Sequence, residues 1–214
     1  MIGVQDLMES RFVQALIAGL VVALGWIANG WQNRREAARL RAEKLRDYHR
    51  AVYAEIASYL ENLDSADALA AYRDRVVATM EADPAYVPLI PRERNDTIFK
   101  ALVEEISILP RVTIDPIVVY YNQLFAIEML IEDMRGARFG ILEQDRRIVM
   151  YRDYMDLKIQ AFNDGHYALR MIAAFAEGGR EAAVAEEARI ARELGAESLS
   201  SPDAGRSGRS RGSG

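Results

Sequence analysis

Residues 12–33 read FVQALIAGLVVALGWIANGWQN and contain no Asp, Glu, Lys or Arg. A helix of this length rises roughly 30 Å, which matches the thickness of a bilayer's hydrocarbon core. Trp26 and Trp31 lie toward its C-terminal end, where aromatic side chains anchor helices at the membrane interface. The stretch therefore predicts a transmembrane anchor at residues 12–33, preceded by a short N-terminal segment at residues 1–11.

Two other interpretations of residues 12–33 stay open. A buried core helix would explain the apolar composition, but such helices seldom run so far without a charge. A cleaved signal peptide would need small residues before its cleavage site, and Ala28 and Gly30 supply them. The preceding segment MIGVQDLMESR, however, carries two acids against one arginine, whereas a signal peptide begins with net positive charge. The anchor is the favoured interpretation.

Arginines are distributed unequally about the predicted anchor. One precedes it, whereas the segment after it carries Arg34, Arg35, Arg39, Arg41, Lys44, Arg46 and Arg50. The positive-inside rule then places the C-terminal bulk in the cytoplasm and the N-terminus outside. We therefore expect a single-pass protein of a bacterial inner membrane, with Trp26, Trp31, Arg34 and Arg35 at the membrane interface.

Composition narrows the function classes. The chain has 214 residues, half of them hydrophobic, a net charge of −5, no cysteine and two histidines. The acidic balance argues against a general nucleic-acid partner. The lack of cysteine excludes disulfides, thiolate catalysis and cysteine-ligated metal sites. Abundant Ala, Arg and Glu favour helices, so the predicted fold is all-α.

The predicted membrane-proximal segment, residues 34–82, is a long helix or a helix pair. An apolar stripe with coiled-coil character recurs at spacings of three and four, through Leu45, Tyr48, Val52, Ile56, Tyr59 and Leu63. Asp64 and Ser65 mark a candidate break, and periodicity alone does not decide between one helix and two. His49 lies among charged residues and is predicted to be a solvated surface side chain.

Two features of the N-terminal half favour self-association. Ala15, Gly19 and Ala23 lie four residues apart, a spacing that lets membrane helices approach closely, although small residues are common in such helices anyway. The apolar stripe continues directly out of the anchor. The candidate oligomer face therefore comprises Ala15, Gly19, Ala23, Leu45, Tyr48, Val52 and Ile56.

Residues 83–179 are predicted to form an antiparallel helical bundle. It begins with a proline-rich connector at residues 83–95, containing DPAYVPLIP, which is too rich in proline for a helix. Helices are then expected at residues 96–109 with Asp96 as N-cap, from Asp115-Pro116 to Gly136, and at residues 142–176. Residues 180–214 are predicted to hold a marginal exposed helix followed by a disordered tail from Ser198.

No motif predicts a catalytic, cofactor or metal site. No acid precedes His49 or His166 by three positions, as a bundle di-iron site would require. His166 is expected at the edge of the core. The chain has no glycine-rich phosphate loop, no Gly-x-Ser-x-Gly and no His-Glu-x-x-His, so we expect no enzyme.

The chain resembles uncharacterised single-pass membrane proteins of alphaproteobacteria and their prophages. The residues that carry this resemblance are Leu45-Arg46-Asp47-Tyr48, Ile90-Pro91-Arg92-Glu93-Arg94, Leu109-Pro110, Ile114-Asp115-Pro116 and Tyr120-Tyr121, within residues 12–176. These are packing and capping patterns, and the resemblance implies no established activity.

The leading hypothesis is a non-catalytic, membrane-tethered interaction or scaffold protein. Its partners would be the lipid bilayer and a second copy, or another membrane or cytoplasmic protein. One alternative is a sensory or ligand-binding bundle with a pocket lined by Tyr120, Tyr121, Met150, Tyr151, Tyr154 and Met155. The other is a phage-derived envelope or lysis protein.

Overall fold

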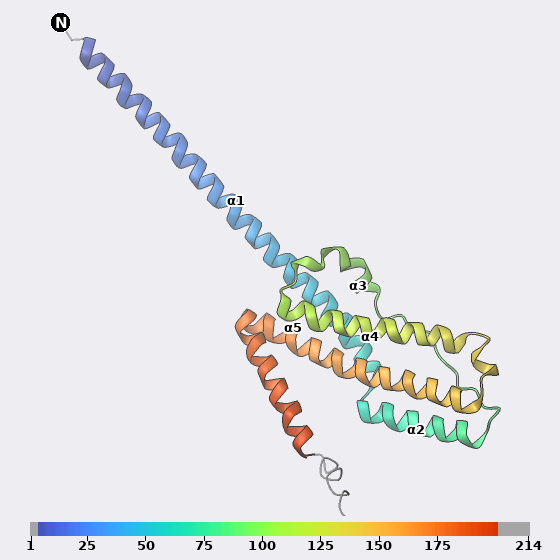
Figure 1. The fold of residues 1–214 in the computed structure, drawn as a ribbon. Helices are drawn as coiled ribbons and strands as arrows, with labels where there is room; N and C mark the ends of the chain where they lie inside the picture. Colours follow the sequence, from blue (N-terminus) through green and yellow to red (C-terminus); the bar gives the residue numbers. More distant parts are fainter. Residues whose placement is uncertain (1–3, 201–214) are drawn as a thin grey trace, which may run out of the picture. The chain divides into compact units, whose positions relative to one another are not determined.

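The computed structural model describes residues 4–200, with the side chains of residues 19–20 and 24–196. Over these residues the chain is all-helical, as predicted, and contains no strand. Figure 1 shows the elements, which are α1 (Val4–Leu63), α2 (Ala66–Ala82), α3 (Thr97–Leu102), the 3-10 helix η1 (Val103–Ile108), α4 (Arg111–Arg135), the 3-10 helix η2 (Phe139–Ile141) and α5 (Gln144–Ser200). The predicted disordered tail lies outside the described residues beyond Ser200.

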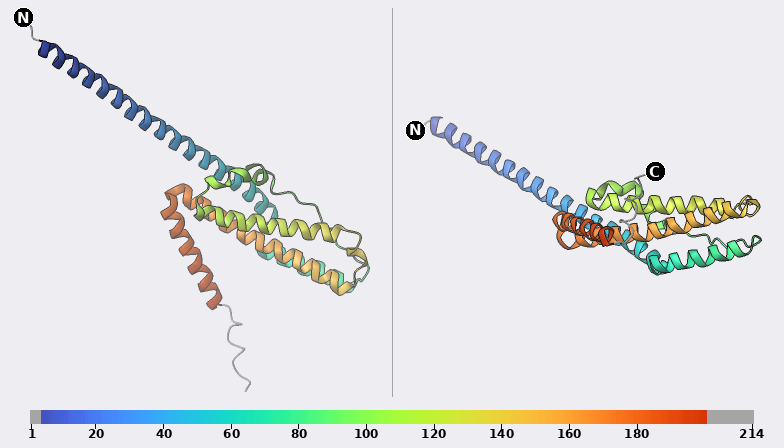
Figure 2. Two further views of the ribbon diagram at one scale, coloured as in Figure 1. Left: turned by 45° about the horizontal axis from the view of Figure 1, so that its top comes forward. Right: turned by 60° about the horizontal axis from the view of Figure 1, so that its bottom comes forward.

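The chain divides into two compact units, Met1–Asp47 and Tyr48–Gly214. The first contains the N-terminal part of α1. The second contains the rest of α1 and all later elements, so the bundle begins at Tyr48, whereas we predicted its start at residue 83. Within this unit α4 and α5 lie side by side in all views, and α2 packs on α5 (Figures 1 and 2).

The structure decides between one helix and two after the first unit. Helix α1 ends at Leu63, and Asp64 takes a left-handed backbone conformation with φ of 67°. The hydroxyl of Ser65 then accepts a hydrogen bond of 3.1 Å from the Ala68 N–H, an N-cap for α2. Aspartate tolerates the left-handed conformation better than most residues. The break between α1 and α2 is therefore favoured by the residues at the break itself.

Helix α4 begins earlier than the sequence pattern indicated. We predicted its start at Asp115-Pro116, but it begins at Arg111 with Pro110 as N-cap, and Pro116 lies inside it. The first turn is closed by the Ile114 N–H on the Pro110 carbonyl at 3.0 Å. Pro116 is buried against the core, which offsets the loss of one intrahelical hydrogen bond. The helix ends at Arg135, before the predicted stop at Gly136.

The core lies between the C-terminal part of α1 and helices α2, α4 and α5. Its largest fully buried side chains are Tyr120, Tyr121, Tyr151, Phe139, Ile56, Met80, Ile117, Met171 and Val52. At Gly165 of α5 the backbone approaches α1 closely. An added Cβ there would lie 2.9 Å from Leu60 Cδ2 and 3.0 Å from Tyr120 Cε2, so only glycine fits without movement.

Helix α5 is broken where the sequence predicted a stop. Gly178 and Gly179 leave helical geometry, and Gly179 has φ of 66° and ψ of −151°, a conformation open essentially to glycine alone. The chain then continues as a second helical stretch, which we call the C-terminal limb (residues 180–196). The limb was expected to be a marginal exposed helix with a thin apolar face of Val184, Ile190, Leu194 and alanines. Val184 and Leu194 are exposed, whereas Ile190 and Ala183 are buried.

The packing of the C-terminal limb is narrow. Ala183 and Ile190 are buried and form a small cluster with Met171 of α5. The partly buried side chains that pack against this cluster are Val112, Tyr167 and Phe175. The limb is therefore a tertiary element of the bundle rather than a free helix.

One helix among the described residues, α4, is long and apolar enough to cross a membrane. Its apolar face is buried in the bundle, through residues such as Ile117, Leu124 and Ile131. The core helix of a soluble bundle has the same length and composition. Of the predicted anchor, residues 12–18 and 21–23 lie outside the residues whose side chains are described.

Candidate functional site

The predicted membrane-interface residues are all solvent-exposed in the structure. The Trp26 side chain is 82% exposed, and the Arg35 guanidinium lies 3.6 Å from the centre of the Trp31 ring, a cation–π contact. Arg34 is exposed as well. The large apolar side chains described in this stretch, Leu20, Leu24 and Ile27, are also exposed. Five large apolar groups in twelve residues thus face solvent.

The candidate oligomer face is only partly available. Tyr48, Val52 and Ile56 are buried in the chain's own core, so our assignment of these three residues to an intermolecular face was wrong. The physical reason is that an apolar stripe packs equally well against helices of the same chain. Gly19 has open space where a side chain would be, and Leu45 is half-buried. Ala15 and Ala23 lie outside the described side chains.

Glu55 of α1 holds the start of α3. Its carboxylate accepts hydrogen bonds from the Ile98 N–H at 2.6 Å and the Phe99 N–H at 3.0 Å. It also accepts one from the Tyr121 hydroxyl at 2.6 Å, and the Tyr121 ring stacks on Phe99. Burial, followed by this carboxylate, raises the pKa of Tyr121. The predicted cap, Asp96, instead pairs with Lys100 at 2.6 Å. The amides of α3 are therefore capped from another helix.

Glu93 fixes the proline-rich connector to the bundle. Its carboxylate accepts hydrogen bonds from the Tyr59 hydroxyl at 2.6 Å, the Lys158 ammonium at 2.7 Å and the Tyr154 hydroxyl at 3.4 Å. Burial, and next the Glu93 charge, raise the pKa of both tyrosines. With both oxygens engaged by side chains of α1 and α5, this carboxylate serves as a structural acceptor.

The same connector is held by donors on its backbone carbonyls. Arg147, which is buried, donates to the carbonyls of Tyr86 and Pro84. Arg135 donates to the Ile90 carbonyl at 2.6 Å. The expected non-helical connector is thus present, and charge-assisted bonds keep it packed.

The environments of both histidines differ from the predicted ones. His49 is buried, with its Nε2 2.9 Å from the Thr113 hydroxyl oxygen and its ring against Phe175. Because that hydroxyl donates to the Pro110 carbonyl, His49 Nε2 is the donor in this pair. Burial lowers the pKa of His49 to about 4. His166, expected at the core edge, is exposed beside Phe162.

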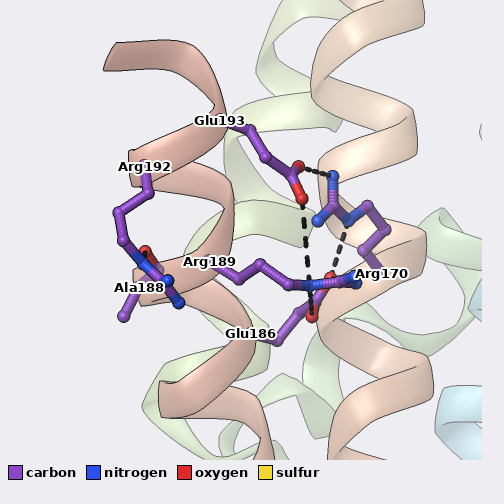
Figure 3. Close-up of polar contacts among 6 residues, drawn as sticks. All are labelled: Arg170, Glu186, Ala188, Arg189, Arg192 and Glu193. Atoms are coloured by element: carbon purple, nitrogen blue, oxygen red, sulfur yellow. Dashed lines mark hydrogen bonds and ion pairs between the residues drawn. The ribbon is translucent and has the colours of Figure 1, made fainter. Parts of the chain in front are cut away.

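A charged network joins the C-terminal limb to the part of α5 that precedes the break at Gly178 and Gly179 (Figure 3). Arg170 of α5 donates to Glu186 at 2.7 Å and to Glu193 at 2.8 Å, and Arg189 also binds Glu186. Hydrogen bonds from Arg189 and Arg170 lower the pKa of Glu186 to about 2. These pairs border the narrow apolar contact of the limb and set its position on α5.

Most of the tyrosine and methionine side chains that we considered as the lining of a ligand pocket lie in the core. Tyr120, Tyr121, Tyr151, Tyr154 and Met155 are buried by packing. A different hollow lies between the same two helices and has a volume of about 590 Å³. We call it the α4–α5 groove, and its lining residues are Ala126, Met129, Leu130, Asp133, Asp153, Asp156, Leu157 and Gln160. No sequence motif singled these residues out.

Metal-ligating side chains do not gather anywhere in the part of the chain that the structure describes, where no three His, Asp or Glu residues form a cluster. The half-buried carboxylates Glu55 and Glu93 each accept hydrogen bonds from donors of the chain itself. Their geometry holds α3 and the connector in place.

Comparisons of this chain with family models, with curated proteins and with solved structures found no match.

Proposed function

We propose that the chain is a membrane-tethered helical protein that binds another protein, with residues 12–33 as a single-pass anchor and the bundle as the cytoplasmic interaction domain. The observation that carries this proposal is the uncharged stretch at residues 12–33. Its described large apolar side chains, Leu20, Leu24, Trp26, Ile27 and Trp31, are exposed. A helix that is apolar all round is stable where lipid or protein surrounds it.

The change in charge after residue 33 supports the direction of insertion. Residues 34–47 carry six basic and three acidic side chains, a net charge of +3. The described side chains from Arg34 to Ala42 are all exposed. A basic, solvated helix directly after an apolar one is typical of the cytoplasmic end of a membrane span.

The bundle favours binding of a partner on its surface over binding of a small ligand in its interior. Its interior is filled by aromatic and aliphatic side chains, and the half-buried carboxylates Glu55 and Glu93 are occupied by the chain's own donors. The α4–α5 groove is an open hollow on its surface. Open apolar grooves between helices are a common site for protein partners.

Membrane fractionation tests the anchor. We expect the full-length chain in the membrane pellet after alkaline carbonate extraction. The double substitution Leu20→Arg and Leu24→Arg should move it to the soluble fraction, because each charge near the centre of a span costs about 2.5–3.5 kcal/mol. Leu40→Arg is the matched control, since Leu40 is exposed but lies outside residues 12–33. A soluble wild-type chain would refute the tether.

A reporter at the C-terminus tests the orientation. Alkaline phosphatase fused after Gly214 should be inactive, and green fluorescent protein at the same position should fluoresce. An active phosphatase would place the bundle on the opposite side of the membrane and overturn the cytoplasmic assignment.

A further inference from the structure

The contact between α4 and α5 forms one seam that continues along both helices. Val112, Val119, Ala126 and Asp133 are spaced seven residues apart on α4, and Leu157, Asp164 and Met171 are spaced seven apart on α5. Residues seven apart lie almost on the same face of a helix. Both rows therefore border a single strip of surface, which we call the α4–α5 seam.

The two ends of this seam differ in what covers them. At one end the C-terminal limb packs through Ala183 and Ile190 on Met171, with Val112 beside them. At the other end lies the α4–α5 groove, where Met129 is 67% exposed beside Leu130 and Leu157. The limb shows that this seam accepts a helix by burying small and branched apolar side chains. The groove is the continuation of the same surface, without a helix on it in the described chain.

The charge along the groove is of one sign. Asp133, Asp153 and Asp156 line it, and no lysine or arginine does. Asp133 and Asp153 have no ion-pair partner among the described residues. Asp156 uses one oxygen to bind Arg73 at 2.5 Å.

A further carboxylate lies on the same face of α5. Asp164 is four residues beyond Gln160 and seven beyond Leu157, both of which line the groove. Its Oδ2 is buried without a hydrogen-bond partner in the described chain. Burial without a nearby cation raises the pKa of this carboxyl. Asp164 therefore adds a carboxylate, unpaired within the described chain, to the seam between the groove and the C-terminal limb.

We propose that the α4–α5 groove binds an amphipathic, basic helix of a partner protein. The apolar face of that helix would cover Met129, Leu130 and Leu157, and its Lys or Arg side chains would pair with Asp133 and Asp153. This is the helix-in-groove mode of recognition. The inference rests on the interaction role proposed above, but it does not depend on the membrane anchor.

The dimensions favour a helix over a small ligand. The lining residues on α4 run from Ala126 to Asp133, about 10 Å along the helix axis at 1.5 Å per residue. That length matches two turns of a docked helix. The groove is open along its side, whereas sites for small molecules enclose most of their ligand.

A peptide-binding experiment on the full-length chain tests the proposal. The chain is placed in nanodiscs of zwitterionic lipid and immobilised, with empty nanodiscs as the reference surface. The probe is a synthetic 18-residue peptide of leucine and lysine in helical amphipathic order. Two controls carry glutamate in place of lysine, or the same residues in scrambled order. We expect saturable binding of the basic amphipathic peptide alone.

Substitutions in the groove then localise the binding. Asp133→Asn with Asp153→Asn should weaken binding about fivefold to tenfold and flatten its salt dependence, as expected for exposed charge pairs. Met129→Lys should abolish it. The matched controls are Glu104→Gln with Asp67→Asn for the acids, and Val103→Lys for the methionine. These exposed positions do not line the groove and should leave the affinity unchanged.

Three outcomes would overturn the proposal. The first is equal binding of the glutamate peptide, and the second is binding that the groove substitutions do not affect. The third is a dimer, measured by light scattering, that Met129→Lys dissolves, because the groove would then be an interface between copies of this chain. Failure of the anchor appears separately, in the fractionation experiment, and leaves the peptide result interpretable.

Discussion

Replacing Gly165 by alanine should destabilise the bundle, although alanine is the better helix former. In a solvated helix the change would stabilise by about 1 kcal/mol. Here the new Cβ would lie 2.9 and 3.1 Å from the two Cδ atoms of Leu60 and 3.0 Å from Tyr120 Cε2. Carbon atoms prefer separations of about 3.5–4.0 Å, so Leu60 or the α5 backbone must move by at least about 0.6 Å.

Little space exists for that movement, because Leu60 is 4% and Tyr120 0% exposed. Overpacking of this kind costs about 1–3 kcal/mol, which exceeds the gain in helix propensity and leaves a net loss of about 1 kcal/mol. Chemical denaturation in detergent, followed by circular dichroism, measures this free energy of unfolding.

A double-mutant cycle isolates the cause. In a Leu60→Ala background the clash with both Cδ atoms disappears, so Gly165→Ala should cost less there than in the wild type, or even stabilise. Gly140→Ala is the matched control, since an added Cβ meets nothing within 4 Å. If Gly165→Ala stabilises the wild-type chain by the full helix-propensity increment, the close approach of α1 and α5 is not what glycine provides at this position.

Three further changes test other features of the bundle. The folded-state pKa of His49, about 4, lies below the unfolded value of about 6.5, so stability that is complete above pH 6.5 should fall by about 1.4 kcal/mol per unit down to pH 4. His49→Gln should remove that slope in pH-dependent denaturation. Glu55→Ala leaves three donors without their acceptor and should cost about 2–4 kcal/mol, with faster amide exchange at Ile98 and Phe99. Gly179→Ala should cost about 1–3 kcal/mol because of the positive φ at this position, and it should speed exchange throughout the C-terminal limb. Unchanged exchange would contradict the requirement for glycine at the break in α5.

Local sequence signals predicted the elements well, and long-range contacts account for most of the differences. The stops before Gly136 and at Gly178-Gly179 are confirmed, because a helix end depends on residues within one turn. The Asp115-Pro116 start was wrong, although aspartate before proline is a common helix start. Pro110 had already started the helix five residues earlier, and tertiary packing tolerated Pro116 inside it.

The sequence did not identify which polar side chains face the core. We predicted a solvated His49 because its neighbours in sequence are charged, and no sequence pattern drew attention to Glu55. Both nevertheless flank the buried residues Val52 and Ile56 at helical spacing, and that position signals a core-facing side chain. The partners that make burial tolerable, Thr113 and Tyr121, are more than sixty residues away. Periodicity in a single sequence identifies such a face but not the residue that satisfies it.

The attachment of α3 to Glu55 makes one short segment sensitive to a distant motion. Six residues are too few to remain helical by themselves, so α3 depends on the carboxylate supplied by α1. A slip of α1 by one helical turn would carry that carboxylate about 5 Å from the amides it holds. The Ile98 and Phe99 amides would then lose their acceptor, so the order of α3 depends on the position of α1.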